Sequence, residues 1–249
     1  MTKAVINPKY QSLEKFIEEL PLIFDESGDI TYSARNTIKT FDVGEYTINV
    51  KSFKKPIFIN QIAYVTIRSS KAKRSYQNAQ KLLDMGFNTP CPIAYIEEKR
   101  YKILTNSYYL SVHEEFDGML RELQAGTVES HKELIRQFAL FIAALHEKQV
   151  LHLDFSPGNI LYKLKDGIYT FYLVDLNRMK FDNPLDLDMA CSSFRRLWGN
   201  DDMIHYMVEV YAKNRNLDEK ICIEKVFKYR KEFWDAFTKR HPDESPYIS

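Results

Sequence analysis

Two carboxylates and one amide stand out for the chemistry that they could perform together. Asp154 and Asn159 lie five residues apart in the stretch VLHLDFSPGNILYK, and Asp175 follows in LVDLN. Such oxygen ligands suit Mg²⁺, which usually keeps several waters and binds through a few protein oxygens and substrate phosphates. An alcohol is too weak an acid to attack phosphorus unaided, so a carboxylate that can deprotonate it is useful. With Asn159 and Asp175 as metal ligands, Asp154 is free for that task.

The elements around this stretch must bring the three side chains together. Residues 131–146 place apolar side chains on one helical face, so a helix is expected to precede the stretch. Two strand-like runs follow, NILYKL and IYTFYLVDL, joined through Lys165-Asp166-Gly167. An Asp-Gly pair between apolar runs is a strong hairpin signal. If the hairpin folds back, Asp175 at its end comes near Asn159.

This arrangement resembles the active-site pattern of protein kinases. Those enzymes carry a catalytic-loop Asp, an Asn five residues later, and a metal-binding Asp after a hairpin. HLDFSPGN stands in the place of H-R-D-L-x-x-x-N, and DLN in the place of D-F-G. The Asp-to-Asn spacing alone would be a weak signal, but the flanking helix, the hairpin and the later Asp strengthen it. The alternative is that Asp154 and Asp175 are turn and capping residues.

The first part of the chain predicts strands with one well-marked inserted helix. Residues 29–53 alternate on both sides of Gly44, and IAYIEE and YYLSVHEEF, residues 93–98 and 108–116, also read as strands. The helical segments are residues 13–20, which should stop at Pro21, and residues 71–84, with Gly86 as a C-terminal cap.

We therefore expect an α+β, two-lobed, protein-kinase-like fold. Residues 1–116 would form a small antiparallel-sheet N-lobe with one main helix, and residues 117–249 a helical C-lobe that carries the catalytic loop. A hinge is expected near residues 113–117, with a cleft between the lobes. Clefts of this kind are where ligands bind.

In this fold, a strand lysine of the first lobe should reach the α- and β-phosphates of ATP. Lys51 in INVKSF has the best strand setting, and its competitors are Lys39, Lys54 and Lys55. No Gly-rich phosphate loop is present, and its nearest equivalent is the turn that contains Ala34, Arg35 and Asn36. Residues 71–81 contain no Asp or Glu to pair with the lysine, so Gln77, or else Ser75, would take that place.

Composition excludes several other classes of protein. The 249 residues carry 35 Lys and Arg against 34 Asp and Glu, so no basic field argues for nucleic acid. Three widely separated cysteines argue against a zinc site or a disulfide framework. The N-terminal residues lack an apolar signal core, and the longest apolar run, FALFIAALH, is too short to span a bilayer. A cytoplasmic location is expected, and peripheral contact with the cytoplasmic face of the inner membrane is compatible with it.

Over roughly residues 30–200, the chain resembles the bacterial lipopolysaccharide core kinases, which phosphorylate heptose or Kdo sugars. The stretches that carry the resemblance are VKSFKKP, KAKRSYQNAQKLLDMGFNTPCPIAYIE, HLDFSPGNILY and VDLNRMKF. The resemblance implies ATP and Mg²⁺ as cofactors and a sugar hydroxyl of the lipopolysaccharide inner core as acceptor. It implies the following roles: Asp154 as base, Asn159 and Asp175 on Mg²⁺, Lys51 on the phosphates, and Glu114, Glu115 and Phe116 in the hinge that faces adenine.

The sequence indicates the residues that would contact the acceptor less clearly. Arg178, Arg195 and Arg196 follow the metal-binding Asp, and arginine suits bidentate contact with the carboxylates or phosphates of such glycolipids. Surface or core-pairing arginines are an equally good interpretation. Leu153 replaces the catalytic-loop Arg of many protein kinases, which argues against a phosphorylation switch. Two alternatives stay open: a kinase of a protein or soluble small molecule, and a nucleotide-binding pseudokinase that acts as a partner-binding module.

Overall fold

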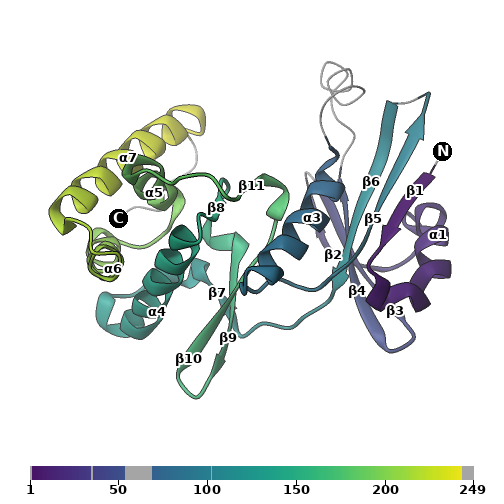
Figure 1. The fold of residues 1–249 in the computed structure, drawn as a ribbon, viewed down its shortest axis with the longest axis horizontal. Coiled ribbons are helices and arrows are strands. Elements are labelled where there is room, and N and C mark those ends of the chain that lie inside the picture. The colour runs from purple at the N-terminus through teal and green to yellow at the C-terminus, as the bar shows by residue number, and fades with distance from the viewer. Residues whose placement is uncertain (1, 35, 54–68, 102, 243–249) are drawn as a thin grey trace. The chain divides into compact units, whose positions relative to one another are not determined.

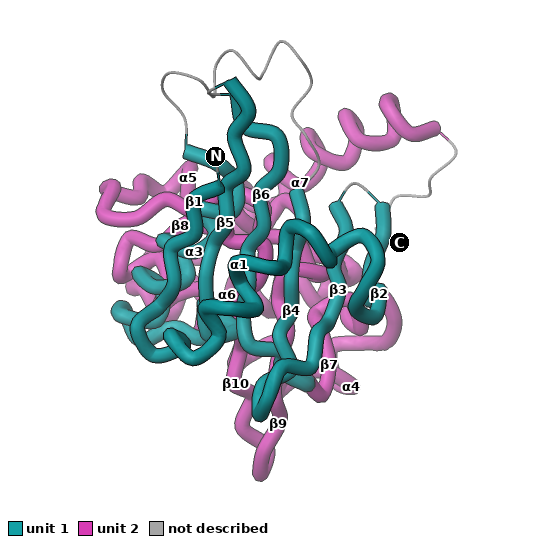
Figure 2. Tube along the Cα trace, turned by 90° about the vertical axis from the view of Figure 1, so that its right-hand side faces the viewer, with its two compact units in different colours: residues 1–115 teal, residues 116–249 magenta. Residues whose placement is uncertain are grey.

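The chain forms two compact units, residues 1–115 and 116–249, which Figure 2 shows in different colours. The structure is a computed structural model that describes residues 2–34, 36–53, 69–101 and 103–242. Helices and antiparallel strands are both abundant in it, which confirms the predicted α+β class.

The first unit is built on a sheet whose described strands follow the order β1-β5-β6-β4-β3-β2, with every neighbouring pair antiparallel (Figure 1). Its elements are β1 (Thr2–Ile6), η1 (Pro8–Leu13), α1 (Glu14–Ile23), β2 (Asp29–Ser33), β3 (Asn36–Val43), β4 (Tyr46–Phe53), α3 (Lys71–Asp84), β5 (Pro92–Arg100) and β6 (Ile103–Val112).

The two helices α1 and α3 cover opposite faces of this sheet (Figure 1). Side chains alternate between the faces of a strand, so β4 contributes to both cores. Ile48 and Val50 belong to the core that α1 covers, and Phe53 packs with Ala72 and Tyr76 of α3. The odd-numbered positions of β4, which include residue 51, therefore share the face that α3 covers.

Two expectations for this unit are wrong in detail. α1 does not stop at Pro21 but continues to Ile23, although a proline there cannot donate a backbone hydrogen bond. Burial of Leu20 and Phe24 in the core holds this last turn in place, and the Phe24 amide donates to the Leu20 carbonyl at 2.9 Å. The strand expected over residues 108–116 ends at Val112.

The second unit combines helices with two small sheets, of strand order β10-β9-β7 and β11-β8 among the described residues. Its elements are β7 (Gly118–Met119), η2 (Leu120–Gln124), α4 (Val128–Glu147), β8 (Leu151–His152), η3 (Pro157–Asn159), β9 (Ile160–Lys165), β10 (Ile168–Leu173), η4 (Leu176–Arg178), β11 (Met179–Lys180), α5 (Leu187–Ser192), η5 (Ser193–Arg196), α6 (Asp201–Asn214) and α7 (Glu219–Arg240).

The predicted hairpin is present as β9 and β10. Its turn residues Asp166 and Gly167 both have positive φ, 51° and 78°, as the tight turn of a two-residue hairpin requires. The helix before the catalytic stretch, α4, begins at Val128, three residues before its predicted start, because Thr127 caps it through the Ser130 amide.

The last helix, α7, is anchored by polar contacts as well as by apolar packing. The buried guanidinium of Arg230 donates to the carbonyls of Leu197 and Gly199, and Trp234, four residues further along the helix, is also buried. Over the part of the chain that the structure describes, no helix is long and apolar enough to cross a membrane.

Candidate active site

The loop that carries Asp154 is tied to the segment that follows Asp175. Strand β8 pairs with β11, with His152 opposite Met179. The Leu153 amide donates to the Arg178 carbonyl at 2.8 Å. These main-chain bonds hold two segments that lie more than twenty residues apart in sequence, so the loop has a fixed position relative to Asp175.

His152 lies beneath this loop and is a structural residue. Its side chain is 4% exposed, its Nδ1 accepts from the Asp154 amide at 3.1 Å, and its Nε2 donates to the Val174 carbonyl at 3.1 Å. Burial lowers the pKa of His152 to about 4, so the imidazole is neutral near pH 7. The ring therefore joins the two backbone segments.

An aromatic cluster anchors the same loop to α4. The ring of Phe155 stacks on Phe138 at 5.8 Å between centroids, and Phe138 also contacts Phe171 of β10 at 5.3 Å. Phe138 and Phe155 are buried. The residue directly after Asp154 is thus fixed in the core, which limits the positions that the Asp154 side chain can take.

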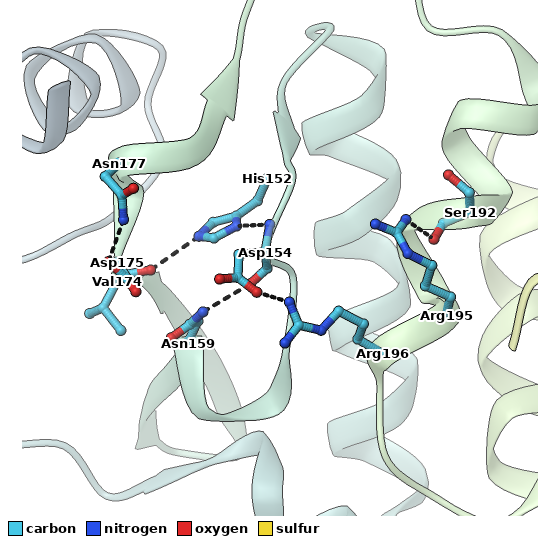
Figure 3. A network of polar contacts seen from close by, with 9 residues as sticks. All are labelled: His152, Asp154, Asn159, Val174, Asp175, Asn177, Ser192, Arg195 and Arg196. Carbon is cyan, nitrogen blue, oxygen red and sulfur yellow. Dashed lines mark hydrogen bonds and ion pairs between the residues drawn. The ribbon is translucent and has the colours of Figure 1, made fainter. Parts of the chain in front are cut away.

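Asn159 closes the loop on Asp154 and keeps its oxygen available. Its Nδ2 donates to the Asp154 carbonyl at 2.9 Å, while its Oδ1 accepts no hydrogen bond from the residues that the structure describes (Figure 3). The Val174 amide donates to the Asn159 carbonyl at 3.0 Å. Asn159 is therefore bonded both to the loop that carries Asp154 and to the residue before Asp175.

Asp175 has the left-handed backbone conformation, with φ 56° and ψ 48°. Asn177 supports its carboxylate, with Nδ2 donating to Oδ1 at 2.7 Å. One carboxylate and one amide oxygen are the kind of donor set that Mg²⁺ takes when phosphates complete its shell. The described residues hold no group of three His, Cys, Asp or Glu placed to bind a metal by themselves. Asn159 and Asp175 thus fit a phosphate-dependent Mg²⁺ site.

Arg196 has a partner that the sequence did not reveal. It was predicted to contact the acceptor, but its Nη1 donates to Oδ1 of Asp154 and the two side chains form an ion pair (Figure 3). Its guanidinium also lies 5.6 Å from the ring centroid of Phe233 on α7. Within the described chain, Oδ2 of Asp154 accepts no hydrogen bond, so its lone pairs are unused there.

The other two predicted acceptor arginines lie in different surroundings. Arg195 leaves η5 on another side from Arg196 and donates to the Ser192 carbonyl at 2.7 Å (Figure 3). Arg195 and Arg196 both line a cavity of about 200 Å³ in the second unit, whose wall also contains Lys180. Arg178 is exposed and does not line this cavity. No sequence pattern predicts that Lys180 lies near the two arginines, because only the fold brings these residues to one cavity.

In the first unit, Lys51 and Lys39 have different surroundings, and Lys39 is the one alternative phosphate-binding lysine that lies in the described residues. Lys39 is 6% exposed, and its ammonium donates to the carbonyls of Phe24 and Ser27 at 2.6 and 2.9 Å. It therefore closes the C-terminal end of α1, where a cation is favourable. Lys51 is half-buried, with its ammonium 5.3 Å from the Phe53 ring centroid. Lys54 and Lys55 lie outside the described residues.

The remaining predicted nucleotide contacts lie in three separate segments. Ala34 is exposed and its amide donates to the Asn36 carbonyl at 3.1 Å, whereas Arg35 lies outside the described residues. Gln77 is exposed on α3. In the hinge stretch, Glu114 is half-buried, Glu115 is exposed, and Phe116 packs edge-on against Tyr172 at 5.1 Å.

The fold has a counterpart among solved structures. A solved structure described as "WaaP in complex with acyl carrier protein" matches with a TM-score of 0.62, covering 93% of this chain and 99% of that chain. At 12% sequence identity, this likeness shows the shared fold alone. No curated protein sequence matches this chain.

The sequence itself then identifies the family. The profile of the "Lipopolysaccharide kinase (Kdo/WaaP) family" matches residues 31–186, well over half of the 249-residue chain. The chain belongs to this family, and it is a kinase. The predicted resemblance and the predicted enzyme class are both confirmed.

Proposed function

We propose that this kinase transfers the γ-phosphoryl group of ATP to a sugar hydroxyl of the lipopolysaccharide inner core, on Kdo or heptose. The main support for the proposal is that hydrogen bonds connect Asn159 to Asp154 and to the residue before Asp175, in a chain of the lipopolysaccharide kinase family. The family supports the class of acceptor, and the loop supports the chemistry.

Asp154 is the proposed base. Its second carboxylate oxygen, Oδ2, would accept the proton of the acceptor hydroxyl. At the same time the hydroxyl oxygen would form its bond to the γ-phosphorus, the bond between the γ-phosphorus and ADP would break, and ADP would leave. Arg196 occupies Oδ1 and would thereby direct Oδ2 toward the acceptor. The bond from Asn159 to the Asp154 carbonyl and the stacking of Phe155 on Phe138 would keep the base in place.

Oδ1 of Asn159 and the carboxylate of Asp175 would hold Mg²⁺. The metal, when bound, would neutralise charge on the phosphates of ATP. Asn177 would orient the Asp175 carboxylate through its 2.7 Å hydrogen bond. Lys51 would bind the α- and β-phosphates, Ala34 to Asn36 and Gln77 would lie near the nucleotide, and Glu114 to Phe116 would face adenine.

The proposed acceptor is a membrane glycolipid, so we expect the protein to work at the cytoplasmic face of the inner membrane by peripheral contact. The absence of Asp and Glu from residues 71–81 is the feature that a pseudokinase would share. The available Oδ2 of Asp154 and the donor pair of Asn159 and Asp175 favour a working enzyme instead.

The test incubates the protein with γ-labelled ATP, Mg²⁺ and a fractionated extract of its own cells. Wild type is compared with Asp154→Asn, which keeps the shape of the side chain and removes its basicity. Label is expected in the lipopolysaccharide fraction with wild type only. Label in protein or in soluble metabolites would keep the kinase and reject the acceptor, and no Asp154-dependent label in any fraction would favour the pseudokinase.

A further inference from the structure

The cavity beside the catalytic loop has a marked asymmetry of charge. Its volume is about 200 Å³, and its charged lining residues are Lys180, Arg195 and Arg196. No carboxylate lines it, since Asp154 faces Arg196 from outside the wall. Three cations thus border one small cavity whose wall contributes no acid.

Two of these three cations lack a countercharge among the residues that the structure describes. Within the described chain, neither the Lys180 ammonium nor the Arg195 guanidinium forms an ion pair, and the only hydrogen bond that Arg195 makes is to the Ser192 carbonyl. The guanidinium has five N–H donors in a planar fork, so most of them are unused. The Arg195 side chain is half-buried, and this burial lowers the pKa of its guanidinium.

A partly desolvated cation without a partner is unfavourable, and a bound anion would offset that cost. Arginine is suited to this task because its fork matches the two oxygens of a carboxylate or phosphate. From the cavity, its charges and the unused donors, we propose that Arg195 and Lys180 form a subsite for an oxyanion of the acceptor, either a carboxylate or a phosphate substituent of the sugar. This inference rests on the proposed function.

The size and the wall of the cavity agree with such a subsite. Complete small-molecule sites measure roughly 300–1,000 Å³, so this cavity would take one charged group and part of a ring. Leu151 and Met189 supply an apolar wall. The hydroxyls of Ser192 and Ser193 already donate to the carbonyls of Met189 and Ala190, so the donors for an oxyanion come from the cationic side chains.

Arg196 connects the subsite to the chemistry. It borders the cavity, and it pairs with the Asp154 carboxylate (Figure 3). Because Arg195 and Arg196 are neighbours on η5, an oxyanion held by Arg195 would lie at a fixed offset from Oδ2 of Asp154. The subsite would therefore select acceptors that carry an anionic group near the hydroxyl to be phosphorylated.

The test measures binding and turnover with separate probes. Free Kdo, which carries a carboxylate, carboxyl-reduced Kdo, and inorganic phosphate are each titrated into the full chain by calorimetry, without ATP. Wild type is compared with Arg195→Met and Lys180→Met. Arg240→Met is the matched control, because Arg240 also donates to a single backbone carbonyl, that of Ala236, but is exposed at the end of α7.

We expect Kdo to bind wild type and Arg240→Met equally and to bind Arg195→Met at least about tenfold more weakly, as for loss of a charge-assisted hydrogen bond. Carboxyl-reduced Kdo should bind none of them, and Arg195→Lys should recover part of the affinity. Binding of phosphate but not Kdo would assign the subsite to a phosphate substituent. Equal affinities in wild type and Arg195→Met, or no binding of either anion, would overturn the proposal.

Label transfer to the inner-core glycolipid separates this inference from the proposed function. If wild type transfers label and Arg195→Met keeps the same KM for the glycolipid, the subsite is wrong and the function stands. If wild type binds Kdo through Arg195 but transfers no label to the glycolipid, the subsite stands and the function is wrong.

Discussion

The guanidinium of Arg196 donates to Oδ1 of Asp154, across 42 residues of sequence. The ion pair is partly exposed, and Phe233 of α7 lies under the guanidinium. A base that must accept a proton from one defined direction benefits from having its other oxygen occupied. With Asp154 as the proposed base, Arg196 would position it through this ion pair, a contact that the sequence did not indicate.

Replacing Arg196 should lower turnover more than nucleotide binding. In Arg196→Met, the Asp154 carboxylate can rotate, and a misplaced catalytic group costs up to about a hundredfold in rate. We expect kcat to fall about ten- to a hundredfold with the KM for ATP unchanged, and Arg196→Lys to recover part of the loss. Steady-state kinetics with the glycolipid acceptor would measure both quantities.

Phe233→Leu is the matched variant for this prediction, because it removes the ring under the guanidinium and leaves the ion pair intact. An exposed or partly exposed cation–π contact contributes about 0.5–1 kcal/mol, so kcat should fall by less than about tenfold. A larger loss in Phe233→Leu than in Arg196→Met would show that the packing of α7, and not the ion pair, positions the base.

Asp175→Asn should weaken Mg-ATP binding without disturbing the backbone. Asp175 and the hairpin residue Asp166 both have positive φ, 56° and 51°, a conformation that asparagine also tolerates. Each substitution therefore removes only a carboxylate. The Mg²⁺ concentration for half-maximal ATP binding should rise at least about tenfold in Asp175→Asn and stay at the wild-type value in Asp166→Asn. Equal Mg²⁺ dependence in the two variants would argue against Asp175 as a ligand.

Periodicity and turn chemistry are local, and they predicted the elements that depend on local sequence. The helix over residues 71–84 has its predicted bounds because its apolar positions lie within the segment and Gly86 follows two residues after its end. The Asp166-Gly167 hairpin likewise carries its own turn signal. Strand β1, by contrast, was missed, since its place at the sheet edge depends on pairing with β5, some ninety residues away.

The candidate site shows the same division. The bonds that join Asn159 to Asp154 and to the residue before Asp175 could be anticipated from sequence, because loop and hairpin spacing brings these segments together. The pairing of Arg196 with Asp154 and the approach of Lys180 to Arg195 depend on how α5, η5 and β11 pack around the loop. No sequence spacing encodes such contacts between elements that are distant along the chain.

Two lysines on neighbouring strands should have separable roles. Lys39→Met removes the donor to the carbonyls of Phe24 and Ser27, and unmet buried acceptors cost about 1–3 kcal/mol each, so we expect a marked fall in the melting temperature. Lys51→Met should change the melting temperature little and raise the KM for ATP at least tenfold. Thermal melts and ATP titrations of the two variants would decide. Weaker ATP binding in folded Lys39→Met, with normal binding in Lys51→Met, would reverse the assignment.

Stability should fall as the pH drops below about 6.5. Burial lowers the pKa of His152 to about 4 and that of His146 to about 3, whereas the unfolded chain protonates both near the ordinary value of about 6.5. Between these pH values the unfolded state binds more protons than the folded state, so acid favours unfolding.

Urea unfolding at a series of pH values from 7 to 5 would measure this dependence, with an expected total loss of a few kcal/mol. His146 is buried, with Nδ1 2.8 Å from the Tyr211 hydroxyl, so His146→Gln should roughly halve the slope even if it lowers the overall stability. A free energy of unfolding that is constant from pH 7 to 5 would contradict a neutral His152. It would then also contradict the hydrogen bond that His152 Nδ1 accepts from the Asp154 amide.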